Sequence, residues 1–150
     1  MGNNQKVTLF VQCLVDTHYP EVAEAMLRVL QRLGVSLNCP ADQTCCGQPA
    51  YNSGYAEEAR QVARKQLAAF PRDYPVVVPS GSCAGMMRHH YPYLFAGQPE
   101  WEQTRRFAER VFEFTEFMHH VLGVRLRDQG PPIRVTWHSS CHAMREMKVT

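Results

Sequence analysis

The sequence is short of cysteine and of net charge. Its six cysteines in 150 residues lie below the roughly 8–10% that is typical of a disulfide-stapled scaffold. Sixteen lysines and arginines face 14 acidic residues, which leaves a formal charge of +2. The basic residues are scattered, so nothing predicts a nucleic-acid partner. At 45% hydrophobic and 20% charged the chain is not a disordered tail, and a chain of this length can hide roughly two-thirds of its unfolded surface in a core.

Long hydrophobic runs are also missing, and nothing in the sequence predicts a membrane span. The apolar stretch from Val7 to Val15 is too short for one. No small-residue cleavage site follows it that would mark a signal peptide. We therefore expect a cytoplasmic protein. Thiols stay reduced in the cytoplasm, where clustered cysteines bind metal more often than they cross-link.

What the sequence does have is an alternation of short apolar runs and helical periods. The expected strands cover residues 6–13, 35–39, 76–78 and 133–137. The expected helices cover residues 20–33, 55–70, 83–91 and 99–122, with a further one opening at Cys141. Residues 40–54 are expected to form a loop. Strands that alternate with helices favour an α/β fold, with a parallel sheet flanked by helices.

The cysteines fall where the strands of such a sheet would end. Cys13 closes the first expected strand, and Cys83 follows the third. Cys45 and Cys46 lie in the loop after the second. Because ligands collect at the carboxyl ends of parallel strands, these four thiols should meet at one edge of the sheet. Four thiolates can hold an iron–sulfur cluster or a tetrahedral zinc ion, and no Cys-x-x-Cys pair decides between the two.

The spacing of these cysteines resembles a known family. Cys13 is followed after 31 intervening residues by Cys45-Cys46-Gly47, and 36 residues lie between Cys46 and Cys83. This pattern is similar to the cysteine-rich CCG domain of the heterodisulfide reductase B subunit and of related iron–sulfur oxidoreductases. Residues 79–86 (Pro-Ser-Gly-Ser-Cys-Ala-Gly-Met) and 138–142 (His-Ser-Ser-Cys-His) most resemble its lactate utilization protein A branch.

The resemblance implies a function and a cofactor, but it identifies no catalytic residue. It implies a [4Fe-4S] cluster on the four cysteines and electron transfer while L-lactate, a 2-hydroxy acid, is oxidised to pyruvate. The implied partners are the other subunits of a lactate-oxidising complex, including a ferredoxin-like iron–sulfur protein. The family's last cysteine is Met86 here, which leaves four thiolates because a thioether is a much weaker ligand for iron. Two alternatives stay open, namely a zinc-stabilised interaction module without a redox role and a thiol–disulfide reductase.

Further residues are candidates for binding the cofactor. Gly47 is expected where the backbone must pass close to a ligand. Ser80, Gly81 and Ser82 precede an expected helix, so their backbone N–H groups could face an anion, and a plain turn with Ser82 as the N-cap is the alternative. Cys39 lies outside the family pattern and is expected in the core.

The sequence also contains a short internal repeat. Val7-Thr8 precedes Cys13 at the same interval at which Val135-Thr136 precedes Cys141. We expect residues 1–130 to be the first half of a duplicated CCG-domain fold, and residues 131–150 the start of a second half that is cut short. Cys141 is then expected to be a metal ligand of a second site.

Overall fold

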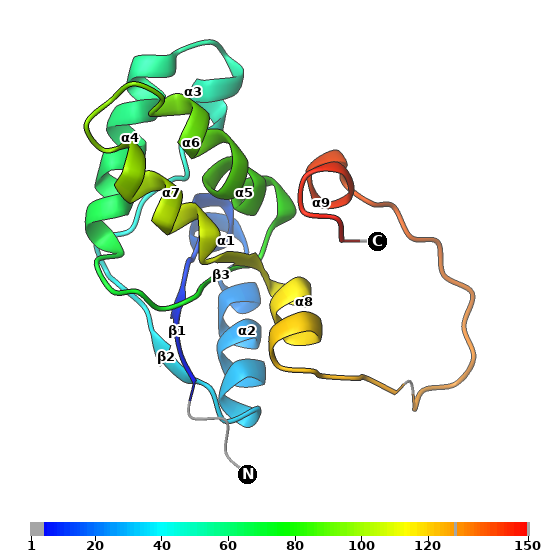
Figure 1. Ribbon diagram of the computed structural model, residues 1–150. Coiled ribbons are helices and arrows are strands. Elements are labelled where there is room, and N and C mark those ends of the chain that lie inside the picture. Colours follow the sequence, from blue (N-terminus) through cyan, green and yellow to red (C-terminus); the bar gives the residue numbers. More distant parts are fainter. Residues whose placement is uncertain (1–4, 128, 150) are drawn as a thin grey trace.

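The computed structural model describes residues 5–127 and 129–149, and its strands form one parallel sheet (Figure 1). The strands are β1 (Lys6–Leu9), β2 (Ser36–Asn38), β3 (Val76–Val78) and β4 (Val111–Glu113). Their order is β2-β1-β3-β4, and every neighbouring pair is parallel. This confirms the predicted α/β fold. The strand order reverses between β1 and β3, which is where ligands bind in open sheets of this kind.

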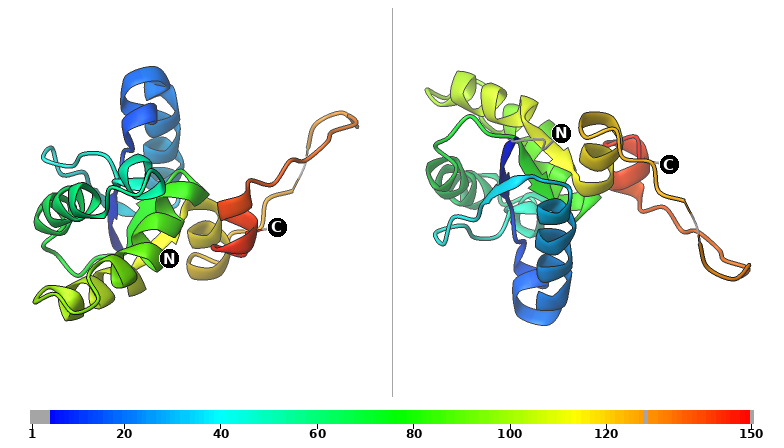
Figure 2. Two further views of the ribbon diagram at one scale, coloured as in Figure 1. Left: turned by 90° about the horizontal axis from the view of Figure 1, so that it is seen from above. Right: turned by 90° about the horizontal axis from the view of Figure 1, so that it is seen from below.

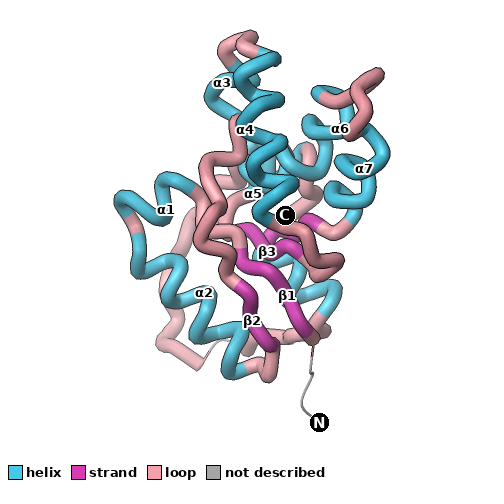
Figure 3. Tube along the Cα trace, turned by 90° about the vertical axis from the view of Figure 1, so that its left-hand side faces the viewer, coloured by secondary structure: helices cyan, strands magenta, loops and turns pink. Residues whose placement is uncertain are grey.

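Helices cover both faces of the sheet (Figure 3). In chain order they are α1 (Cys13–His18), α2 (Pro20–Arg32), α3 (Gln48–Asn52), α4 (Ala56–Ala69), α5 (Gly81–Gly85), the π-helical turn η1 (Met86–His90), α6 (Tyr91–Leu94), α7 (Trp101–Glu109), α8 (Phe114–Glu116), the π-helical turn η2 (Phe117–Val121) and α9 (Cys141–Arg145). Successive residues of a strand point to opposite faces. Val77 accordingly packs with Met26 and Leu30 of α2, whereas Val76 and Val78 pack with the helices of the other face, including α4 and α7.

Local signals in the sequence set the ends of α2. Proline stands at its first position, where the missing N–H costs nothing. Gly34 follows its last turn with φ +77°, the left-handed conformation in which glycine commonly ends a helix. Both ends agree within one residue with the helix that the sequence predicts over residues 20–33.

The long helix predicted over residues 99–122 is wrong. Helix α7 ends at Glu109, and Val111–Glu113 then pair with β3 as the fourth strand. The apolar period continued through this strand, so a helix and a strand could not be told apart by spacing alone. A capping box starts α8, because the Glu113 carboxylate accepts hydrogen bonds from the backbone N–H groups of Thr115 and Glu116. Pairing with β3 and this cap together override the helical pattern.

Three other expectations about elements also differ from the structure. Residues 133–137 form no strand among the described residues, and their apolar side chains are exposed, with Trp137 76% accessible. This segment lies away from the rest of the fold (Figure 2). The helix expected to stop before Pro92 continues through η1 into α6, where proline falls in the first turn and needs no N–H partner. The predicted loop over residues 40–54 contains the short helix α3.

Within the described part of the chain, no helix has the length and apolar character needed to cross a bilayer.

Candidate metal centre

Four cysteines meet at the carboxyl ends of β1, β2 and β3. The Sγ atoms of Cys13 and Cys45 lie 3.8 Å apart, and those of Cys46 and Cys83 lie 3.3 Å apart. Cys45 and Cys46 are neighbours in the chain, which links the two pairs. Cys13 does not close β1 as expected, since β1 ends at Leu9 and Cys13 is the first residue of α1. The structure nevertheless brings together the four thiols that the topology argument placed at one sheet edge.

Gly47 shapes the loop that carries two of these cysteines. Its φ is +83°, a conformation that glycine adopts without steric cost. Its backbone N–H donates to Cys45 Sγ at 3.4 Å. An added Cβ would lie 3.3 Å from the carbonyl oxygen of Ala59, so the loop also packs too closely on α4 to leave easy room for a side chain. Gly47 thus turns the backbone so that an amide faces a thiol.

Buried polar side chains hold the cysteine loop in place. The Tyr91 hydroxyl donates to the carbonyl oxygen of Cys46 at 2.8 Å, and Gln66 Nε2 donates to the carbonyl oxygens of Cys45, at 3.0 Å, and of Thr44. Both side chains are fully buried. Buried carbonyls need such partners, because leaving one unpaired costs about 1–3 kcal/mol. These two residues hold in place the backbone segment that carries Cys45 and Cys46.

Sequence reasoning missed these supporting residues, although one signal was available. Gln66 lies on the buried face of α4, which also carries Ala59, Ala63 and Leu67. A polar residue at a core position of a helix needs a partner, and the nearby loop supplies it. Gln12 was also missed. It precedes α1, and its Oε1 accepts a hydrogen bond from Cys83 Sγ at 2.8 Å.

Three of the thiols have raised pKa values, and so disfavour ionisation, as long as they face only other thiols. The hydrogen bond with Cys46 and burial raise the pKa of Cys45 well above its ordinary value. For Cys46, a hydrogen bond with Cys45 lowers the pKa, but Cys83 and burial outweigh it and raise the pKa to about 12. Burial likewise raises the pKa of Cys13. A metal cation would reverse this balance, because a coordinating thiol gives up its proton.

The four cysteine sulfur atoms are suitable ligands for a metal ion or a cluster, although they do not surround a central position where either could bind. Among residues 5–127 and 129–149, no group of three or more His, Cys, Asp or Glu side chains is already placed to hold a metal ion. The thiols instead contact one another in two pairs, as protonated thiols do when they share hydrogen bonds. Four sulfur donors on one edge are the chemistry that iron–sulfur clusters and zinc require. Metal binding by these four cysteines stays a prediction.

The two other cysteines do not join this cluster. Cys39 is exposed, so the expectation that it belongs to the core is wrong. It follows the edge strand β2 and leaves the sheet, and its Sγ accepts a hydrogen bond from Gln43. Cys141 is also exposed, at the first turn of α9. None of the contacts between thiols in the described structure includes Cys141, and its role as a ligand of a second site stays a prediction.

The Ser-Gly-Ser turn opens the helix that carries Cys83. Ser80 is the N-cap of α5, in place of Ser82, and the two hydroxyl oxygens lie 2.9 Å apart. An added Cβ on Gly81 would lie 2.6 Å from Ala143 Cβ, and one on Gly85 would lie 2.0 Å from Glu146 Oε2. These glycines therefore let α9 pack directly on α5. Contact between residues 80–82 and a cofactor stays a prediction.

Comparison with known proteins places the chain in a family. The family model described as "Cysteine-rich domain" (CCG) matches residues 7–88, which include the four clustered cysteines. The chain is 46% identical to lactate utilization protein A of Geobacillus thermodenitrificans over 141 residues, which cover 93% of this chain and 59% of that protein. It is 41% identical to lactate utilization protein A 2 of Bacillus cereus (strain Q1) over 145 residues, which cover 96% of this chain and 60% of the relative.

The chain thus spans about 60% of the length of these relatives. No solved structure matches it. The match over residues 7–88 includes the Cys-Cys-Gly loop and the thiol after β3, the same features that the sheet topology gathers at one edge. The chain belongs to the cysteine-rich CCG domain family.

Proposed function

We propose that this chain is an iron–sulfur subunit that transfers electrons while L-lactate, a 2-hydroxy acid, is oxidised to pyruvate. The observation that carries the proposal is the gathering of Cys13, Cys45, Cys46 and Cys83 at one sheet edge. The names of the relatives, lactate utilization protein A, supply the substrate. A [4Fe-4S] cluster on these thiolates would supply a one-electron carrier.

The residues around the thiols would position the ligands and tune the cluster. The Gly47 amide faces Cys45 Sγ, and hydrogen bonds to ligand sulfur together with burial set the reduction potential of such a centre. Cys46 and Cys83 are buried, whereas Cys13 is exposed. Electrons would therefore enter or leave on the side of Cys13, where a partner can approach.

The proposed setting rests on the family resemblance and extends beyond the names of the relatives. The partners would be the other subunits of a lactate-oxidising complex, among them a ferredoxin-like iron–sulfur protein, and the reduced thiols fit the cytoplasm. Residues 131–150 would begin a second CCG half. In support, α9 starts at Cys141 just as α1 starts at Cys13, so the two similar sequence segments both lead into a helix that begins with cysteine. Cys141 would then bind a metal of that second half.

A zinc-stabilised module without a redox role is the second candidate, and one distance favours it. Two thiolates on a tetrahedral zinc ion lie about 3.8 Å apart, given Zn–S bonds of about 2.3 Å. The separation of Cys13 and Cys45 is 3.8 Å, whereas Cys46 and Cys83, at 3.3 Å, would have to move apart to bind the same ion. A thiol–disulfide reductase gains no comparable support, because that chemistry needs a lowered thiol pKa and the pKa values of Cys45 and Cys46 are raised.

Visible absorption separates the first two candidates. The chain would be purified without oxygen, reduced with dithionite and then reoxidised while its spectrum is recorded. The iron–sulfur proposal predicts a brown protein whose absorption bleaches and returns. A colourless protein with one equivalent of zinc, unchanged by dithionite, would contradict it and support the zinc module.

A further inference from the structure

The sulfur atom of Cys83 has a side-chain amide as a hydrogen-bond partner. Cys83 Sγ donates to Gln12 Oε1 at 2.8 Å and lies 3.3 Å from Cys46 Sγ. Cys45 Sγ, by contrast, accepts a hydrogen bond from the backbone N–H of Gly47 at 3.4 Å. A backbone N–H can only donate, whereas a glutamine side chain carries both an acceptor oxygen and two N–H donors. Gln12 can therefore partner the sulfur of Cys83 both with and without its proton.

The position of Gln12 closes a ring of contacts through the cysteine cluster. Gln12 precedes Cys13 in the chain, and Cys13 Sγ lies 3.8 Å from Cys45 Sγ. Cys45 is followed by Cys46, whose sulfur contacts that of Cys83, and Cys83 leads back to Gln12. This last hydrogen bond joins residues 71 positions apart, so it ties the segment after β1 to helix α5. The two pairs of thiols are thus connected by the chain on one side and by the Gln12 amide on the other.

The side chain of Gln12 takes no part in capping the helix that it precedes. Gln12 is the N-cap residue of α1 in the described structure, with an extended backbone (φ −69°, ψ 158°) and no side-chain hydrogen bond to that helix. Preferred N-cap residues have short side chains that bond to the first helical turn. The longer glutamine side chain reaches α5 instead, so the residue at position 12 serves the cysteine cluster and not its own helix.

Loss of the thiol proton reverses what Cys83 needs from its partner. A cysteine that coordinates a metal gives up its proton, and its sulfur can then accept a hydrogen bond but cannot donate one. The oxygen of Gln12 would face a negatively charged sulfur, which repels it. Rotation about the last side-chain bond of glutamine exchanges this oxygen for the NH₂ group, and that torsion is broad and roughly two-fold. The same side chain can therefore satisfy both states.

We propose that Gln12 is a positioning residue of the metal centre. Its amide accepts a hydrogen bond from the Cys83 thiol in the metal-free chain and donates one to the Cys83 thiolate when a metal is bound. This role rests on the proposed function and adds to it a residue that tunes the centre. A hydrogen bond to ligand sulfur stabilises negative charge there, so it favours the reduced state and raises the reduction potential. An ionised glutamate at position 12 could accept but not donate, and leucine could do neither.

Redox titration of the whole 150-residue chain, purified without oxygen and followed by visible absorption, tests the donated hydrogen bond. We expect the equilibrium constant for reduction to fall about three- to tenfold in Gln12→Leu, a fraction of the worth of a hydrogen bond to a charged group, because the sulfur is anionic before reduction as well. Gln12→Glu should lower it further, since its carboxylate repels the thiolate.

Gln48→Leu is the matched control for this titration. Gln48 Nε2 donates to the backbone carbonyl oxygen of Ser82, next to Cys83, at 3.2 Å, so its loss removes a glutamine hydrogen bond beside the cluster that does not go to sulfur. The equilibrium constant for reduction should stay unchanged in this variant. Equal falls in Gln12→Leu and Gln48→Leu, or an unchanged constant in Gln12→Leu, would overturn the proposal.

Urea denaturation of the metal-free, reduced chain tests the accepted hydrogen bond without a cofactor. Gln12→Leu should lower the urea midpoint, and this loss should vanish in a chain that already carries Cys83→Ala, because the two groups then no longer interact. Gln12→Glu keeps an acceptor for the thiol and should retain most of the midpoint. A loss from Gln12→Leu that is the same with and without Cys83→Ala would contradict the contact.

A third measurement separates this proposal from the iron–sulfur function. A chain that holds zinc and shows no redox signal contradicts that function, and Zn²⁺ affinity, measured by competition with a chromophoric chelator, then tests Gln12. We expect Gln12→Leu to weaken Zn²⁺ binding about tenfold, as the loss of a group that orients a metal ligand does, and Gln48→Leu to leave it unchanged. A chain that holds iron, but in which Gln12→Leu alters neither the redox titration nor the urea midpoint, contradicts the role of Gln12 alone.

Discussion

At the scale of single residues, contacts between thiols pair the cysteines in a defined way. Cys13 contacts Cys45, and Cys46 contacts Cys83. Adjacent cysteines such as Cys45 and Cys46 seldom join, because the ring they would close is strained. The pairing therefore predicts which thiols react with one another when no metal is bound.

Oxidation of the metal-free chain tests this pairing. A diamide oxidant takes two electrons and two protons from each pair of thiols, and we expect disulfides Cys13–Cys45 and Cys46–Cys83. Cys39 and Cys141, which have no neighbouring thiol in the described structure, should remain free and react with iodoacetamide. Peptide mapping by mass spectrometry identifies the bonds. A disulfide that includes Cys39 would contradict the arrangement.

Gly47 and Gly54 form a matched pair for testing the cysteine loop. Both have positive φ, but an added Cβ at Gly47 would crowd the Ala59 carbonyl, whereas nothing lies within 4 Å at Gly54. A left-handed non-glycine residue costs about 1–2 kcal/mol. We expect Gly54→Ala to lower the free energy of unfolding by about 1 kcal/mol and Gly47→Ala by about 2 kcal/mol, measured by urea denaturation. Equal losses would show that the contact with α4 does not matter.

At the scale of elements, helix α6 supports the cysteine loop through one hydroxyl. Tyr91 is buried and bonds to the Cys46 carbonyl, whereas Tyr93 on the same helix is 77% exposed. Tyr91→Phe should lower the free energy of unfolding by about 1–2 kcal/mol, because it leaves a buried carbonyl unpaired. Tyr93→Phe should change it little. If urea denaturation gives the same value for both variants, the hydroxyl does not hold the loop.

Helix α9 packs on α5 through the glycines of the latter. A methyl group at position 81 would meet the Cβ, Cα and backbone nitrogen of Ala143 within 3 Å, and backbone atoms yield only at a cost of about 1–3 kcal/mol. We expect Gly81→Ala to release α9 and speed hydrogen exchange across residues 141–147, as followed by mass spectrometry. Ser82→Ala is the control. Unchanged exchange in Gly81→Ala would mean that α9 is held by other contacts, such as buried Met147.

The elements also show how far the sequence could predict the fold. Pro20 and Gly34 mark the ends of α2 in the sequence, and the buried run Val76–Val78 marks β3. Strand β4 could not be found, because Val111 and Phe114 continue a helical spacing and only pairing with β3 makes the segment extended. The four thiols followed from topology. Gln12 and Tyr91 did not, because their roles depend on contacts between residues distant in the chain.

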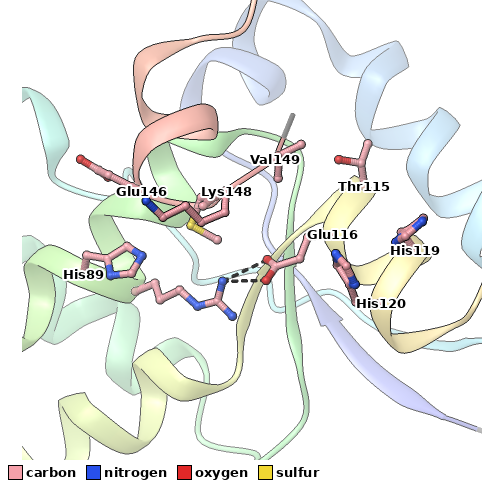
Figure 4. Close-up of a pocket in the computed structure, with 10 residues that line it drawn as sticks. His89, Thr115, Glu116, His119, His120, Glu146, Lys148 and Val149 are labelled. Atoms are coloured by element: carbon pink, nitrogen blue, oxygen red, sulfur yellow. Dashed lines mark hydrogen bonds and ion pairs between the residues drawn. The ribbon is translucent and has the colours of Figure 1, made fainter.

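At the scale of the whole molecule, the edge of the sheet that holds the four thiols is the region to which we assign the proposed redox chemistry. The thiols gather where the strand order reverses, at the carboxyl ends of the sheet. A separate cleft lies where the residues after α9 meet η1, α8 and η2 (Figure 4).

The central claim is that four cysteines hold a [4Fe-4S] cluster, and elemental analysis of the chain purified without oxygen tests it most directly. We predict iron and acid-labile sulfide in equal amounts, about four of each per chain. Cys46→Ser should lose both, whereas Cys39→Ser, which alters an exposed cysteine outside the cluster, should keep both. One zinc ion without sulfide, or equal iron in the two variants, would contradict the account.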